Sequence, residues 1–149
     1  MTLALFLGMV ALPAQVSRHQ SPAPDYRKDT RFQRLLAFFE NAGCPAKKFT
    51  RAFLEAADRY KLDWRLLPSL SFVESTGGKA ARNNNLFGWG SGKANFPSPV
   101  AGIEMVANRL ALSKLYRNKT LDQILATYNP DVSYGPKVKW VMRQISALE

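Results

Sequence analysis

Glu74 is the residue whose position points most directly to chemistry, because this carboxylate ends the apolar run LDWRLLPSLSFVE. Helical spacing within that run puts apolar side chains on nearly every side, which predicts a helix buried inside a bundle. Burial favours the neutral form of a carboxyl group, and a protonated carboxyl group can transfer its proton to a leaving oxygen. The competing interpretation is a Glu74 side chain that reaches solvent past the helix end, or pairs with Lys79 or Arg82.

A second suggestive segment, NNNLFGWG at residues 83–90, follows Glu74 along the chain. Its amides can hydrogen-bond sugar hydroxyl and N-acetyl groups in both directions, and its aromatic faces offer flat apolar surfaces for pyranose rings. Its glycines allow the backbone to approach a ligand closely. The same composition also fits an ordinary turn whose aromatic side chains fill the core.

A third segment combines Tyr128, Asn129 and Pro130 with Tyr134 at the boundary between two predicted helices. A tyrosine hydroxyl at this boundary can orient a carboxyl group or a sugar. The alternative is a simple helix stop, with Tyr134 packed against the bundle.

The elements that position these segments are predicted to be helices only, which makes the fold class all-α. Apolar residues recur at helical spacing, and no segment alternates convincingly as a half-buried strand would. The expected helix starts carry capping side chains, prolines or glycines: Thr30, Pro45, Asp63, Ser98, Thr120 and Gly135. Residues 79–97 lack periodicity and are predicted to form a loop.

Individual residues within these helices carry further expectations. Pro68 stands in the first turns of the buried helix, where a proline can kink the chain, and Gly77-Gly78 is expected to stop this helix. The apolar stripe of the long helix after residue 97 is expected to continue to Leu112 and Leu115.

The composition disfavours several kinds of site. The 149 residues are 46% hydrophobic, which suits one folded domain, and no apolar run reaches the roughly 18–20 residues that span a bilayer. Cys44 and His19 are the single cysteine and histidine, so an internal disulfide is excluded and a Cys/His metal site is disfavoured. A Ser-His-Asp or Cys-His centre would need His19, which lies in a polar N-terminal stretch. We therefore expect no metal and no organic cofactor.

The charge of the chain is strongly positive, with 21 basic and 11 acidic residues and a formal net charge of +10. A positive surface attracts polyanions over long distances, and nucleic acid, anionic lipid and acidic cell-wall polymers all qualify. A solvated basic surface without a specific partner is the alternative.

The N-terminal residues resemble an export signal. Residues 3–12 (LALFLGMVAL) are apolar, and Pro13-Ala14 follows as a plausible cleavage region. We therefore predict a signal peptide over residues 1–14, a polar linker over 15–29 and a folded domain over 30–149. Export would place the protein in the periplasm, the cell wall or the medium, whereas the alternative is a buried N-terminal helix.

Three stretches together resemble the lysozyme-like peptidoglycan hydrolases: AADRYKLDWRLLPSLSFVESTGG, NNNLFGWG and ATYNPDVSYGPKVKWVM. The chain is most similar to the autolysin-type glucosaminidase domains, described as mannosyl-glycoprotein endo-β-N-acetylglucosaminidase-like. The soluble lytic transglycosylases and goose-type lysozymes share the pattern more loosely. The likeness covers roughly residues 46–145. It implies an all-α, lysozyme-like domain with a buried central helix and a substrate cleft.

The resemblance implies a role for each matching residue. Glu74 corresponds to the acid of the family's Glu-Ser motif, and Tyr128 matches the tyrosine near this acid, so both are expected to be catalytic. Ser75 is expected to help hold the geometry of the site. Together with the loop composition, the resemblance predicts these substrate-binding residues: Ser75, Asn85, Phe87, Gly88, Trp89, Asn129 and Tyr134. The chain departs from the family at Thr76, where glycine is usual, and at Trp89-Gly90, where many glucosaminidases have Ile-Lys.

The implied reaction is cleavage of β-1,4 bonds between N-acetylhexosamines of peptidoglycan, with Glu74 protonating the bridging oxygen. A two-carboxylate mechanism needs a second acidic residue across the bond, and the downstream candidates are Glu104, Asp122 and Asp131. Asp131 is favoured because it lies in the loop after Tyr128, whereas the other two fall in helical segments. Without a second carboxylate, the N-acetyl group of the substrate would attack C1.

Three other functions stay open as alternatives. A lytic transglycosylase would use the same acid and give 1,6-anhydromuramic products. An inactive glycan-binding module would keep the aromatic loop and bind without cleaving. A basic nucleic-acid-binding protein is disfavoured, because the basic residues are dispersed and no helix-turn-helix spacing stands out. We expect a monomer whose partners are peptidoglycan glycan strands and anionic wall polymers, with neither nucleic acid nor a transmembrane span.

Overall fold

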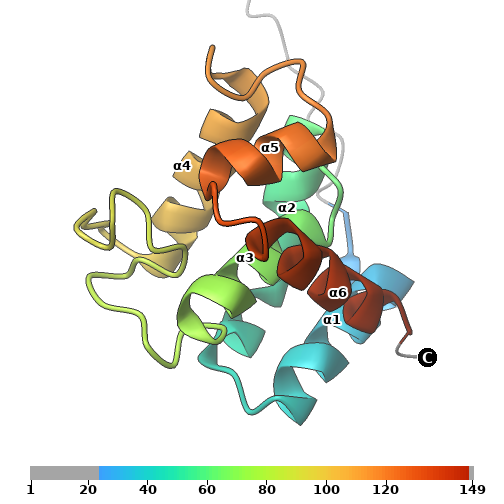
Figure 1. The fold of residues 1–149 in the computed structure, drawn as a ribbon. Coiled ribbons are helices and arrows are strands. Elements are labelled where there is room, and N and C mark those ends of the chain that lie inside the picture. Colours follow the sequence, from blue (N-terminus) through green and yellow to red (C-terminus); the bar gives the residue numbers. More distant parts are fainter. Residues whose placement is uncertain (1–23, 148–149) are drawn as a thin grey trace, which may run out of the picture.

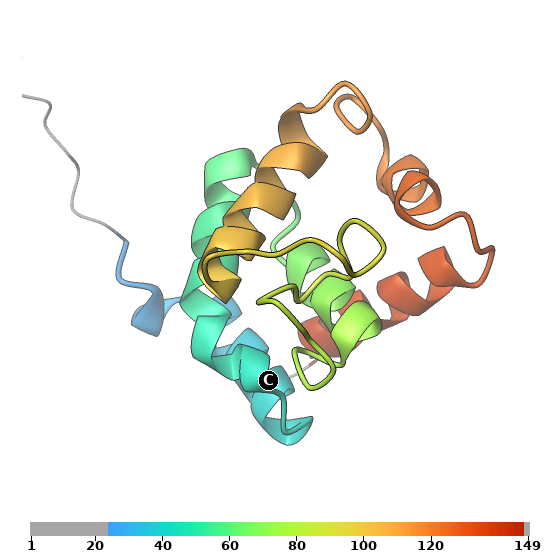
Figure 2. The same ribbon diagram turned by 90° about the vertical axis from the view of Figure 1, so that its left-hand side faces the viewer.

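The computed structural model describes residues 24–147, and this part of the chain consists of helices and connecting turns without a β-strand. The all-α fold class is therefore confirmed. The elements in chain order are η1 (Tyr26–Lys28), α1 (Thr30–Asn41), η2 (Pro45–Phe49), α2 (Thr50–Tyr60), α3 (Leu66–Ser75), α4 (Pro99–Leu112), α5 (Leu121–Tyr128) and α6 (Tyr134–Ala147), where η marks a 3-10 helix. Figures 1 and 2 show these helices gathered around α3, with the long α3–α4 loop at one side.

Two further expectations concern a membrane span and an N-terminal signal peptide. Among residues 24–147, no helix is long and apolar enough to cross a membrane. The predicted signal peptide, residues 1–14, lies outside the described part of the chain.

The folded domain begins before Thr30, which corrects the predicted boundary between linker and domain. Tyr26 in η1 is buried, and its hydroxyl donates a hydrogen bond of 2.8 Å to Asp58 of α2. The cap of α1 is Asp29 and not Thr30, because the Asp29 carboxylate accepts from the backbone N–H of Arg31 at 2.8 Å.

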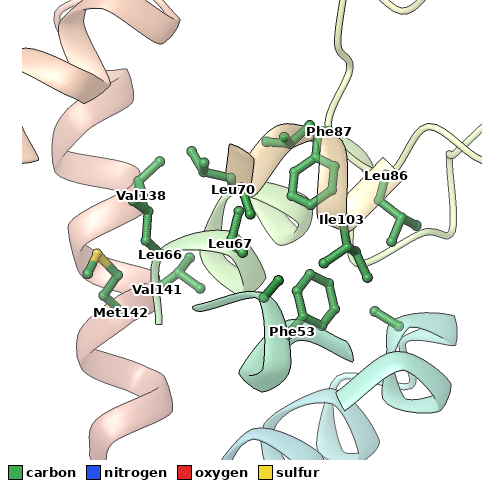
Figure 3. Close-up of a cluster of buried hydrophobic side chains, with 14 of the residues drawn as sticks. Phe53, Leu66, Leu67, Leu70, Leu86, Phe87, Ile103, Val138, Val141 and Met142 are labelled. Atoms are coloured by element: carbon green, nitrogen blue, oxygen red, sulfur yellow. The ribbon is translucent and has the colours of Figure 1, made fainter. Parts of the chain in front are cut away.

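The central helix α3 is buried, and seven of its ten residues are inaccessible to solvent. Figure 3 shows the leucines of α3 between apolar side chains of α6 on one side and of α2 and α4 on the other. The labelled side chains of these four helices are Leu66, Leu67, Leu70, Val138, Val141, Met142, Phe53 and Ile103. Burying one large apolar side chain contributes about 1.5–3 kcal/mol, so this packing fixes α3 against its neighbours.

The two ends of α3 have different local causes. At the start, Pro68 is the third helical residue, where a missing N–H breaks no intrahelical bond. At the end, Thr76 takes the left-handed conformation with φ 54°, one residue before the predicted glycine stop, and Gly77 follows with φ 60°. A Cβ atom on Gly77 would lie 2.8 Å from the Sγ atom of Cys44, so a larger residue would force this turn away from the core.

The later helices start at the predicted caps. Ser98 accepts a hydrogen bond of 3.1 Å from a backbone N–H in the first turn of α4. Thr120 and Gln123 form the predicted capping box of α5. Helix α6 begins at Tyr134, one residue before the predicted start at Gly135.

The expectation that the apolar stripe of α4 reaches Leu112 and Leu115 is wrong, because these side chains are 61% and 57% exposed. Helix α4 ends at Leu112, since Ser113 takes an extended conformation with ψ 149°. Helical spacing therefore no longer applies to Leu115. The segment after α4 instead buries Tyr116.

Candidate active site

Glu74 is half-buried in the last turn of α3 and is hydrogen-bonded to the first residue of α6. The hydroxyl of Tyr134 donates a hydrogen bond of 2.6 Å to its Oε1 atom. Tyr134 is 5% exposed, and the packing of α6 against α3 fixes its ring. Burial, followed by the hydrogen bond to Glu74 and the charge of Glu74, raises the pKa of Tyr134. The phenol therefore stays protonated and remains a hydrogen-bond donor.

The other carboxylate oxygen of Glu74 lies against the backbone of Gly88. Gly88 has φ 58°, and a Cβ atom placed on it would lie 2.6 Å from Oε2. Glycine therefore allows the loop to approach the carboxylate closely. The carboxylate is held between a tyrosine hydroxyl on one side and a loop backbone on the other.

Two residues that were predicted to bind substrate hold the loop in shape instead. Asn85 is 3% exposed, its amide donates to the carbonyl of Trp89 at 2.9 Å, and its Oδ1 accepts from the backbone N–H groups of Phe87 and Trp89. Ser75 is 4% exposed and donates to the carbonyl of Leu86 at 2.8 Å. Because their polar atoms are used within the protein, Asn85 and Ser75 position the loop and do not face a ligand.

Phe87 is also a structural residue, which corrects its predicted place as a ligand-facing side chain. Its ring is fully buried and meets the ring of Phe53 edge-on, with centroids 6.3 Å apart (Figure 3). Its backbone carbonyl accepts a hydrogen bond of 2.7 Å from the hydroxyl of Tyr128. Within the loop, Phe87 thus fills the core, whereas Gly88 and Trp89 line a cleft.

Tyr128 lines the same cleft, but it is not the tyrosine bonded to Glu74. Its hydroxyl donates its hydrogen bond to the carbonyl of Phe87. Its ring stacks on that of Tyr134, with the centroids 5.9 Å apart and the planes at 9° to each other. Burial, followed by the charge of Glu74, raises the pKa of Tyr128. Tyr128 therefore lies in the same cleft as Glu74, whereas Tyr134 makes the direct hydrogen bond to the carboxylate and Tyr128 stacks on Tyr134.

The cleft beside Glu74 has a volume of about 570 Å³. Its walls come from α3, the loop after it, the segment after α4 and the α5–α6 connection: Glu74, Gly88, Trp89, Gly90, Ser91, Tyr116, Tyr128, Asn129 and Pro130. The ring centroid of Trp89 lies 6.4 Å from that of Tyr116 and 5.8 Å from that of Tyr128. The structure thus places a carboxylate in an aromatic-lined cleft, and three predicted substrate-binding residues line it: Gly88, Trp89 and Asn129.

Tyr116 is the cleft residue that the sequence patterns missed. It follows α4 in the segment SKLYRNK, between basic residues and beyond the apolar stripe of the helix. Its ring is buried, and burial raises the pKa of its hydroxyl. The signal that could have found Tyr116 is an aromatic residue standing alone in an otherwise polar, basic turn.

The three residues predicted as a second catalytic carboxylate lie elsewhere. Asp131 is exposed and accepts from the backbone N–H of Ser133 at 2.8 Å, which shapes the turn before α6. Glu104 and Asp122 form ion pairs with basic residues at 2.7 and 2.8 Å. Within residues 24–147, Glu74 is the one carboxylate that lines the cleft.

No lysine or arginine among residues 24–147 forms an ion pair with Glu74. Lys79, one of the two alternative partners, instead donates to the carbonyl of Ala42 at 2.8 Å. The same part of the chain contains no group of three or more His, Cys, Asp or Glu side chains that could hold a metal ion.

Comparison with known proteins finds no match for this chain among protein-family models, curated proteins or solved structures. A function for the cleft therefore rests on its geometry and on the sequence motifs that form it.

Proposed function

We propose that this protein is a lysozyme-like glycoside hydrolase that cleaves β-1,4 bonds in peptidoglycan glycan strands, as an endo-β-N-acetylglucosaminidase-like enzyme. The observation that carries the proposal is the environment of Glu74. This carboxylate lines an aromatic cleft, accepts a hydrogen bond from a neutral phenol and has no cationic partner among residues 24–147. The motifs at Glu74, at residues 83–90 and at Tyr128 support the same chemistry.

Glu74 acts as the general acid in this proposal. Its proton passes to the oxygen that bridges two sugars, and the bond between this oxygen and C1 breaks with its electron pair leaving on the oxygen. An oxocarbenium-like centre then develops at C1. The proton transfer leaves a carboxylate on Glu74, and the hydroxyl of Tyr134, 2.6 Å from Oε1, stabilises that charge.

In this proposal the nucleophile that attacks C1 comes from the substrate itself. Within the described part of the chain, the cleft holds one acidic residue, so the N-acetyl carbonyl oxygen of the cleaved sugar attacks C1, as in substrate-assisted glycosidases. Water then adds to C1, the bond between C1 and the N-acetyl oxygen breaks, and one proton of the water passes to Glu74, which regenerates the acid.

The lining of the cleft supports an N-acetylated sugar as the ligand. Trp89 and Tyr116 supply aromatic surface for the C–H faces of pyranose rings, and Asn129 offers an amide for the N-acetyl group. Arg82 and Lys93 are exposed beside the loop. With the net charge of +10, they attract anionic wall polymers to an exported enzyme.

A lytic transglycosylase is the second candidate, and the single carboxylate of the cleft favours it equally. In that reaction the 6-hydroxyl of the same sugar attacks C1, its proton passes to the Glu74 carboxylate and a 1,6-anhydro product forms, so no second acidic residue is required. Mass spectrometry of the released muropeptides separates the two reactions, because hydrolysis leaves a reducing end with one added water.

The deciding experiment compares Glu74→Gln with the parent protein on purified peptidoglycan. We expect Glu74→Gln to lose about 10³-fold in activity, because an amide cannot donate the proton, while the folded protein keeps its thermal stability. Glu40→Gln is the matched control, since Glu40 is exposed on α1 and lies outside the cleft.

Each outcome has one meaning. If Glu74→Gln digests peptidoglycan as well as the parent, Glu74 is not the acid. If the parent binds glycan strands tightly but releases no fragment, the protein is a glycan-binding module and the hydrolase proposal fails.

A further inference from the structure

A second groove opens between α3 and α6, next to Glu74 but lined by different side chains. Its volume is about 480 Å³, and its lining is Phe72, Val73, Pro136, Lys137, Trp140 and Val141. Val73 immediately precedes Glu74, and Pro136 lies in the same first turn of α6 as Tyr134. The groove therefore adjoins the hydrogen-bonded Glu74–Tyr134 pair along the same two helices.

Trp140 is the exposed aromatic residue of the described chain. Its side chain is 52% exposed, whereas the other aromatic residues within 24–147 are buried or partly buried. What sets Trp140 apart from the exposed aliphatic side chains is its place in the lining of the groove, where its ring offers a flat surface to a ligand. Lys137 is the one charged residue in the groove lining, so the groove offers mainly flat apolar surface.

We propose that this groove is a second subsite for the glycan strand, binding the sugar rings next to those held by the aromatic cleft. The inference rests on the proposed function, because a strand cleaved at an internal bond continues past the acid in both directions. The C–H faces and N-acetyl methyl groups of the sugars pack on Trp140, Phe72 and Val73. Lys137 attracts carboxylates that the strand carries.

The chemistry of the groove favours a sugar over the two other plausible occupants. The exposed ring of Trp140 gives a flat surface that matches the C–H face of a pyranose, and a sugar bound at the rim of the groove keeps its hydroxyl groups in water, whereas a peptide laid along the groove would leave backbone N–H and C=O groups against apolar side chains. A stable interface with a second copy of the chain takes about 20–30 residues per side, far more than the groove provides.

The test uses the full chain carrying Glu74→Gln, so that bound glycan is not cleaved, with Trp140→Ala added. The matched control adds Leu112→Ala, because Leu112 is similarly exposed at the end of α4 and lies outside both linings. Calorimetry measures affinity for β-1,4-linked N-acetylglucosamine chains of two and six sugars. We expect Trp140→Ala to weaken binding of the longer chain about tenfold and to leave the shorter chain unaffected. Leu112→Ala should change neither affinity.

Two results overturn the assignment. One is equal affinity of the Glu74→Gln protein and of the same protein with Trp140→Ala for the two-sugar and the six-sugar chains. The other comes from repeating the calorimetry with muropeptides that carry stem peptides: a loss of affinity for these, with none for the bare sugar chains, assigns the groove to peptide. The two proposals also fail separately: if the parent does not cleave peptidoglycan but the longer chain still needs Trp140 for binding, the glycan groove stands and the hydrolase function falls.

Discussion

Two glutamates among residues 24–147 accept a hydrogen bond from a tyrosine, yet their surroundings differ. Glu104 on α4 accepts from Tyr60 at 2.7 Å and also pairs with Arg59 at 2.7 Å. Glu74 accepts from Tyr134 at 2.6 Å, and no cation among residues 24–147 pairs with it. A tyrosine donor alone therefore does not mark a reactive carboxylate. The missing cation and the adjoining cleft distinguish Glu74.

Most acidic side chains within the described residues resemble Glu104. The acidic residues in ion pairs are Asp25, Asp29, Glu55, Asp58, Asp63, Glu104 and Asp122. Each of these side chains is held by a cation of the protein. Within residues 24–147 no cation pairs with Glu74, and its carboxylate borders the cleft instead.

Among substitutions that keep Glu74 itself, the largest expected effect comes from Gly88→Ala, which displaces the carboxylate without removing it. The added methyl group would lie 2.6 Å from Oε2, so the carboxylate must move. A displacement of about 1 Å can cost about 100-fold in rate, and we expect a loss of that size in the release of soluble muropeptides.

Gly92→Ala is the matched control for this substitution. Gly92 also has a positive φ, of 77°, but nothing lies within 4 Å of its Cβ position. The control should lose about 1 kcal/mol of stability through backbone strain and keep its activity. Equal losses of activity in both variants would show that contact with Glu74 is not the cause.

Tyr134→Phe removes the hydroxyl beside Glu74 and retains the ring that stacks on Tyr128. A hydrogen bond to a charged group contributes about 1.5–3 kcal/mol, so we expect activity to fall at least about tenfold. Tyr60→Phe should leave activity unchanged, because Glu104 lies outside the cleft and keeps its arginine partner. Steady-state rates of the two variants measure the contrast, and equal rates would contradict it.

Alkaline pH should lower the stability of the folded protein through the tyrosines of the cleft. Burial raises the pKa of Tyr128 and of Tyr134 above the ordinary value of 10.0. In the unfolded chain both phenols ionise near pH 10, whereas in the folded protein they stay protonated. Their contribution is therefore fully present below pH 10 and is lost as the pH rises further.

Denaturant unfolding at pH 8, 10 and 11 tests this dependence. Tyr134→Phe should lose less stability across that range than the parent, because one buried phenol with a raised pKa is absent. An identical decline in the two proteins would show that Tyr134 does not contribute.

Arg59→Gln should have the smallest effect. The substitution leaves Glu104 with a tyrosine donor and no cationic partner, which is also the situation of Glu74. Unlike Glu74, Glu104 does not border the aromatic cleft. Both side chains of the pair are partly exposed, so thermal unfolding should register less than about 1 kcal/mol. Activity should be unchanged, and a loss of activity would mean that this face also serves the reaction.

The helices could be predicted because their signals are local. The caps at Ser98 and Thr120 bond to backbone groups only three residues away, and the apolar spacing of α3 required no knowledge of its neighbours. The stripe failed at Leu115 because it was extended past Ser113, where the backbone leaves the helix. It failed at Leu112 because this residue is two positions after the buried Leu110, which puts it on another face of the helix.

The site could be predicted only in part, because residue type does not reveal which way a side chain turns. Asn85 and Phe87 stand beside Gly88 and Trp89, yet the first two turn inward and the others line the cleft. The direct partner of the acid also required the folded chain, since it depends on how α6 docks against α3.

The group that completes the site comes late in the chain. Tyr134 opens the last helix described, and it bonds to an acid that stands 60 residues earlier. Closing so long a loop costs chain entropy, which only the docked helix repays. A nascent or truncated chain that lacks α6 therefore contains Glu74 without its tyrosine partner, so the environment of this carboxylate is complete only after the last described helix has been synthesised and has docked.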